Sequence, residues 1–240
     1  MNKAEEKYNY FNSENNSNNW SYFEDILEYI TFSDEFERNK NGSKESIEEN
    51  VNDFNTLNTK LKDLFYSWIE SIEISGSYYN EFLVDDENSE YLNFNYTYTL
   101  EKLYNIKKVN HIHIEDKIGR DYIFGHKKKY KKKSGFFKNI NSIFNNAEVF
   151  AKPVNDYIKR GKVRYENIAK IYFWGFSLSE VDKPYIEQIL KDNRKTIENV
   201  YLCSYQYNNN FEKSKFQRFL NDNQIDNDIK EFNDEIKKKI

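Results

Sequence analysis

Cysteine, histidine and long apolar runs are scarce in this sequence of 240 residues. The single cysteine, Cys203, excludes an internal disulfide and a zinc cluster built from cysteines. We find neither the apolar core of a secretory signal nor an apolar run of membrane-spanning length, and the N-terminal stretch MNKAEEKYNYFNSE is polar from its second residue. These absences predict a soluble, cytoplasmic protein with no membrane partner.

Positive charge is also not in excess, since the formal net charge is -4. A negative net charge does not favour nucleic-acid binding by the chain as a whole. Aromatic residues, in contrast, are abundant: they make up 18% of the chain, although all hydrophobic residues together make up only 38%. Much of the core is therefore predicted to consist of Phe, Tyr and Trp.

The first part of the chain is predicted to be helical. Residues 1–19 are polar and predict a poorly ordered lead-in. Apolar residues then recur at intervals of three and four over 20–30, and again from about Ser43 to Ile74, before Ser75-Gly76 ends the run. Nothing in the helical part, 20–76, has a catalytic pattern, so we interpret it as packing.

Short apolar segments alternate with helical periods after residue 90. The predicted strands are 91–96, 109–114, 121–126, 170–176 and 200–205, and the predicted helices are 97–104, 136–159 with a bend at Pro153, 182–192, 211–221 and 226–239. This alternation predicts an α/β, Rossmann-like fold with a mostly parallel sheet flanked by helices. We expect one domain over 20–240, with the sheet in 90–205 and C-terminal helices in 206–240.

All three histidines lie between residues 111 and 126. His111 and His113 are two apart in a predicted strand and should point to the same face. Functional groups of a parallel sheet gather beyond the carboxyl ends of its strands, where Asn95, His126 and the turn Gly175–Ser177 are also expected. This set of groups suits a small polar ligand.

Four ordered motifs resemble the AbiH family of bacterial phage abortive-infection proteins. They are YLNFNYTYTLEKLY, VNHIHI, IFGH and IYFWGFSLSEVDKPYIEQI, and they match the family pattern FNYT, HIHG, GH and Gly-x-Ser-Leu followed by Asp and Tyr. The match covers roughly residues 90–190. The resemblance implies a role in phage defence by abortive infection, in which an infected cell is stopped before the phage matures, with a phage or host protein as the trigger.

AbiH proteins are in turn similar to the sirtuin-like NAD-binding fold. This remoter resemblance implies that Asn95 positions water or ribose hydroxyls, that His113 acts as a base, and that the turn from Gly175 to Ser177 faces the ribose. The same motifs imply that Thr97 and Asp182 contact the ligand. His111 and His126 are expected to lie behind the residues that contact the ligand. The implied ligand is a nucleotide, NAD above all, and the implied activity is that of an NAD hydrolase, which needs an activated nucleophile.

Two departures from the family pattern bear on this expectation. Ile114 replaces the glycine of HIHG, and no glycine precedes Gly42. The family begins with a strand and a glycine-rich loop, whose backbone amides would hold a pyrophosphate. The chain is therefore expected to lack that loop and to bind and cleave NAD weakly.

Other interpretations of the same residues stay open. The histidines are also suited to structural hydrogen bonds or to a zinc site, but no fourth ligand is evident and we expect no metal. Asn95 is a residue type that closes turns, and Asp182 one that caps helices. The basic run KKKYKKK at 127–133 is a solvated loop or a nucleic-acid contact. The alternative functions are a non-catalytic interaction protein that keeps the fold and a nucleic-acid-directed effector.

Overall fold

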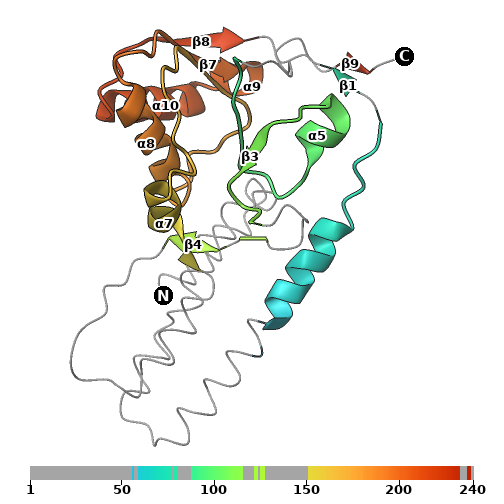
Figure 1. Cartoon of the computed structure of the whole chain (residues 1–240). Helices are drawn as coiled ribbons and strands as arrows, with labels where there is room; N and C mark the ends of the chain where they lie inside the picture. Colours follow the sequence, from blue (N-terminus) through green and yellow to red (C-terminus); the bar gives the residue numbers. More distant parts are fainter. Residues whose placement is uncertain are drawn as a thin grey trace, which may run out of the picture. The chain divides into compact units, whose positions relative to one another are not determined.

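The fold is taken from a computed structural model of the chain, shown in Figure 1. The structure describes residues 56, 59–76, 78–79, 88–115, 122–123, 125–127, 151–232 and 237–238. The predicted lead-in at 1–19, the helix at 20–30 and nearly all of the basic run lie outside these residues. The chain divides into two compact units: Met1–Ile72 with Ile114–Pro153 forms unit 1, and Glu73–His113 with Val154–Ile240 forms unit 2.

Unit 1 contains a helix over residues 59–70, within the predicted helical region. Phe65 is buried on this helix and meets the Tyr122 ring edge-on, with ring centroids 6.1 Å apart. Two short strands, β4 (His126–Lys127) and β5 (Ala151–Lys152), pair in parallel. The predicted strand at 121–126 is present only in part among its described residues: Tyr122 forms an isolated bridge with Ile114, and His126 begins β4.

Unit 2 begins with two small sheets. β2 (Tyr91–Asn93) pairs in parallel with β3 (Val109–His111), and α5 (Thr99–Tyr104) connects them, as the sequence predicts. β3 is shorter than the predicted strand at 109–114, since the chain bends after its third residue. β1 (Tyr78–Tyr79) pairs antiparallel with β9 (Lys237–Lys238).

The larger sheet of unit 2 has the order β6-β7-β8 and is parallel throughout. Its strands and helices follow one another along the chain: α7 (Val154–Lys159), β6 (Lys170–Phe173), α8 (Lys183–Asn193), β7 (Asn199–Cys203), α9 (Ser204–Asn208), α10 (Asn210–Asp222) and β8 (Ile229–Phe232). Figure 1 shows α8 and α10 beside this sheet. The predicted helix at 226–239 is wrong, because 229–232 and 237–238 are strands.

The core of unit 2 lies between the larger sheet and its helices. Leu190 of α8, Val200 and Leu202 of β7, and Phe216 and Leu220 of α10 are each 0% exposed. Apolar burial on this scale is the main stabilising contribution in a fold of this size. In the described part of the chain, no helix is both long enough and apolar enough to span a membrane.

Candidate functional site

Polar side chains converge in unit 2 where β2, β3 and β6 end. His113 follows β3 by two residues, and Asp182 immediately precedes α8, in the segment after β6. Nε2 of His113 lies 3.2 Å from Oδ1 of Asp182. These two residues are 69 positions apart in the sequence, yet the fold brings the segments that follow β3 and β6 to one place.

The His113 imidazole is almost completely buried, with 1% of the residue exposed. The Tyr96 ring stacks on it at a centroid distance of 5.0 Å, and the Phe94 ring meets it edge-on at 5.9 Å. Phe94 also packs against Phe176 and so joins the end of β2 to the segment after β6. The aromatic walls exclude water, and a low local dielectric strengthens the attraction between the imidazole and the carboxylate.

Asp182 is held by a second contact. The Ser179 hydroxyl donates to Oδ2 of Asp182 at 3.0 Å, and the Asp182 amide donates back to the Ser179 oxygen at 3.2 Å. Asp182 does occupy the N-cap position of α8, but its side chain makes no capping hydrogen bond. Its carboxylate instead contacts Ser179 and His113, which fixes the orientation of the imidazole.

Tyr185 lies in the first turn of α8 and is 1% exposed. Burial raises the pKa of its phenol far above the ordinary value of 10.0, and the nearby Asp182 carboxylate raises this pKa further. The phenol is therefore neutral at physiological pH. A neutral phenol beside a carboxylate is a hydrogen-bond donor rather than a base.

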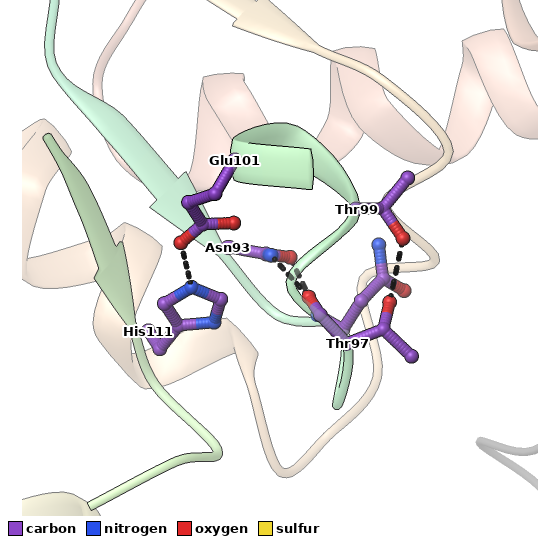
Figure 2. A network of polar contacts seen from close by, with 6 residues as sticks. Asn93, Thr97, Thr99, Glu101 and His111 are labelled. Carbon is purple, nitrogen blue, oxygen red and sulfur yellow. Dashed lines mark hydrogen bonds and ion pairs between the residues drawn. The ribbon is translucent and has the colours of Figure 1, made fainter. Parts of the chain in front are cut away.

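His111 forms a separate imidazole–carboxylate pair, shown in Figure 2. Its Nε2 lies 2.6 Å from Oε1 of Glu101, which belongs to α5, and the Tyr98 ring packs against the imidazole at 4.9 Å. The His111 side chain is 9% exposed and that of Glu101 is 27% exposed. This pair links α5 to the end of β3.

The turn after β2 is closed by Asn93, not by Asn95 (Figure 2). The buried Asn93 amide donates to the Thr97 carbonyl at 3.2 Å and accepts from the Asn95 backbone amide at 2.8 Å. Thr97 and Thr99 share a hydrogen bond between their hydroxyls at 2.8 Å. The Asn95 side chain is left exposed at the strand end, where a ligand can reach it.

The turn after β6 is built around the buried side chain of Gln206. The Gly175 amide donates to Oε1 of Gln206 at 3.0 Å, and Nε2 of Gln206 donates to the Phe176 carbonyl at 2.8 Å. Gly175 has a φ of 65°, a conformation that favours glycine. The Ser177 carbonyl accepts from Lys215. The Gly175 amide is thus used within the protein, which weakens the case that it binds a ligand.

Two further observations on the described residues concern metal binding and the position of a surface groove. No group of three or more His, Cys, Asp or Glu residues among them is placed to hold a metal ion. A groove of about 550 Å³ lies beside α7 and α8, where Arg164, Glu166 and Gln188 contribute to its lining, and it includes none of the predicted site residues. The imidazole–carboxylate pairs at the strand ends are therefore the best candidates for a functional centre.

Comparison with known proteins decides the family. The family described as "Bacteriophage abortive infection AbiH" matches residues 2–205. This chain belongs to the AbiH family. The matched span is longer than the four motifs at 90–190 and covers most of the chain. No match was found among curated proteins or among solved structures. Membership places the chain in phage abortive infection.

The site contains residues that the sequence predicted and others that sequence reasoning missed. The fold brings His113 and Asp182 into contact, whereas His111 pairs separately and His126 belongs to unit 1. Glu101, Ser179 and Gln206 were not predicted. Ser179 stands three residues before Asp182, a spacing that signals a local side-chain turn, but nothing in the sequence marks the other two residues.

Proposed function

We propose that this AbiH protein acts in abortive infection through a nucleotide site at the carboxyl ends of β2, β3 and β6, with His113 as the base. The contact between His113 and Asp182 carries the proposal. Parallel strands connected by helices, β2–α5–β3 and β6–α8–β7, support the Rossmann-like interpretation of unit 2, in which ligands bind at the carboxyl ends of the strands. The AbiH resemblance to sirtuin-like proteins points to NAD as the ligand.

His113 takes up the proton that the reaction releases. Cleavage of the nicotinamide–ribose bond of NAD by water yields ADP-ribose, nicotinamide and one proton. We assign the hydrogen of the neutral imidazole to Nε2, which faces the Asp182 carboxylate, so that Nδ1 is the nitrogen that accepts a proton. The carboxylate then stabilises the imidazolium that forms, which is the ordinary function of a carboxylate behind a catalytic histidine.

Asn95 and the hydroxyl groups of Thr97 and Ser177 are proposed to contact the ligand. The exposed amide of Asn95 projects from the same turn that holds His113 between Phe94 and Tyr96, and an amide suits ribose hydroxyls because it both donates and accepts. Gly175 is proposed to shape this turn through its backbone conformation rather than to donate its amide, which Gln206 already accepts.

The burial of the pair supports a second candidate function. With His113 at 1% and Asp182 at 7% exposure, the contact is also suited to joining β3 to α8 with no chemistry. In that case the chain is a non-catalytic interaction protein. If the pair is structural, loss of one partner lowers the free energy of unfolding by about 3–5 kcal/mol. If the pair is catalytic, an isosteric substitution leaves the stability of the fold largely unchanged.

The test compares His113→Gln, Asp182→Asn and Asn95→Ala in cells challenged with phage. We expect each variant to lose defence, measured by plaque counts, while the purified proteins keep melting temperatures within a few degrees of the parent. Incubation of the parent chain with NAD, followed by assay of nicotinamide, tests the ligand separately. Slow release is expected, and its loss in His113→Gln would tie it to the site.

Asp192→Asn is the matched control, because it makes the same change at an exposed position at the other end of α8. Full defence in all three site variants would overturn the proposed site. Unfolding of His113→Gln and Asp182→Asn would favour the structural candidate. Lost defence without any nicotinamide release would retain the site and reject NAD as its substrate.

A further inference from the structure

The parallel sheet β6-β7-β8 has one covered face. Phe173 of β6 packs on Phe216 of α10 with ring centroids 5.1 Å apart, and Val200 and Leu202 of β7 are 0% exposed on the same side. Because successive side chains of a strand alternate between faces, the residues between them point to the opposite face. That opposite face has a different composition.

Aromatic rings run across the opposite face. Tyr172 of β6 and Tyr201 of β7 are register partners, and their rings stack at 4.5 Å with an interplanar angle of 8°. Phe232 of β8 meets the Tyr172 ring edge-on at 5.5 Å, and Trp174 meets Phe232 at 6.3 Å. Tyr172 is 43% exposed and Tyr201 is half-buried, so these two rings are open to a partner, whereas Phe232 is buried beneath them.

The charges on this face are of one sign. Lys230 is the register partner of Tyr201, Lys170 lies two residues before Tyr172, and both lysines are exposed. Lys230 donates to the Asn199 side chain across the strands, which places both on the open face. The face positions within the three strands contain no acidic residue; they are Lys170, Tyr172, Asn199, Tyr201, Cys203, Lys230 and Phe232. We name these seven residues with Trp174 the aromatic face.

Accessible tyrosine rings are unusual on the face of a parallel sheet, because such sheets normally have both faces covered. Two stacked and accessible tyrosine rings on such a face point to an interaction site. Rings that stack on bases, flanked by cations that contact phosphates, are the combination by which proteins hold single-stranded nucleic acid. A protein partner would need acidic groups to match the two lysines, whereas a nucleic-acid strand supplies negative charge along its whole length.

We infer that the aromatic face binds single-stranded nucleic acid, with Tyr172 and Tyr201 as stacking groups and Lys170 and Lys230 as phosphate contacts. None of these residues belongs to the basic run at 127–133. The aromatic face also differs from the pair His113–Asp182, so binding here is independent of the proposed nucleotide chemistry. The net charge of -4 opposes long-range attraction and restricts binding to the local surface.

The experiment measures fluorescence anisotropy of labelled single-stranded DNA and RNA oligonucleotides titrated with the full chain at low salt. Binding is expected with a dissociation constant of roughly 1–100 µM. Tyr172→Ala with Tyr201→Ala should weaken binding roughly tenfold or more, whereas Tyr172→Phe with Tyr201→Phe should preserve it because the rings remain. Lys170→Gln with Lys230→Gln should weaken binding and reduce its salt dependence.

Two matched controls test whether the effect belongs to this face. Tyr205→Ala with Phe211→Ala removes aromatic residues that are 76% and 75% exposed elsewhere in unit 2. Lys191→Gln with Lys195→Gln changes the net charge equally at other exposed positions. Equal loss in these controls, or no binding by the parent chain up to about 100 µM, would overturn the inference. Self-association that the paired Tyr→Ala change abolishes would instead identify a second copy of the chain as the occupant.

Discussion

The two parallel sheets of unit 2 have the same strand–helix–strand connection, but their strands differ in length and in the burial of their side chains. β7 has five residues and contains Val200 and Leu202, both completely buried. β2 and β3 have three residues each, and none of the residues of β3 is buried. The sheet β6-β7-β8 is held by apolar packing, and the sheet β2-β3 depends on side-chain hydrogen bonds.

Polar groups therefore concentrate where apolar packing is thin. Asn93, His111 and His113 all lie at the ends of the two short strands, and each is held by a partner outside the sheet ladder. The larger sheet provides stability, and the smaller one positions the groups that are suited to chemistry. This division predicts that substitutions in the two sheets differ in size and in kind.

The largest effect is expected in the larger sheet. Leu202→Ala leaves a cavity between β7 and its covering helices, and it should lower the free energy of unfolding by about 2–5 kcal/mol. Urea denaturation of the purified chain measures this change. The same substitution at Leu64, which is 68% exposed, is the control and should change stability by less than about 0.5 kcal/mol. Equal effects at both positions would mean that the sheet is not the stabilising core.

An intermediate effect is expected at the turn after β2. Asn93→Ala removes two hydrogen bonds from a buried turn, and it should lower the free energy of unfolding by about 1–3 kcal/mol. Asn95→Ala, two residues away, removes an exposed amide and should change stability by less than about 0.5 kcal/mol. Chemical denaturation of both variants compares them directly. A larger loss from the second variant would contradict the assignment of the turn to Asn93.

The smallest effect is confined to alkaline solution. Burial raises the pKa of Tyr185 above 10.0, so above that pH the phenol ionises in the unfolded chain while it stays protonated in the folded one. Stability therefore falls as the pH rises beyond 10.0. Tyr185→Phe should lose this contribution, so that its unfolding free energy decreases less between about pH 9 and about pH 11. An unchanged slope would show that Tyr185 titrates normally.

Much of the larger sheet could be predicted because its signals are local. The apolar run at 170–176 and the periodicity at 182–192 correspond to β6 and α8. β8 was missed because DNDIKEFNDEIKKK has the charge spacing of a surface helix. Its backbone pairs with β7 instead, with Ile229 beside Val200, and this long-range pairing overrides local propensity.

The candidate site was less predictable, because its contacts join distant segments. Motif order identified His113 and Asp182 separately, but only the fold shows that they touch. Asn93 and Asn95 alternate in the same short segment, and sequence alone does not show which one faces the turn. Glu101 has no distinguishing signal, because an acidic residue on a short helix is ordinarily solvated.

Trp174, at the end of β6, gives unit 2 an optical reporter of its own. The chain has three tryptophans, and the other two, Trp20 and Trp68, belong to unit 1. A variant with phenylalanine at those two positions would emit from Trp174 alone, whose ring lies against Phe232 and 6.4 Å from Tyr104. Its emission would follow the opening of β6 and β8 during unfolding, and stacked bases on the aromatic face would quench it without any attached dye.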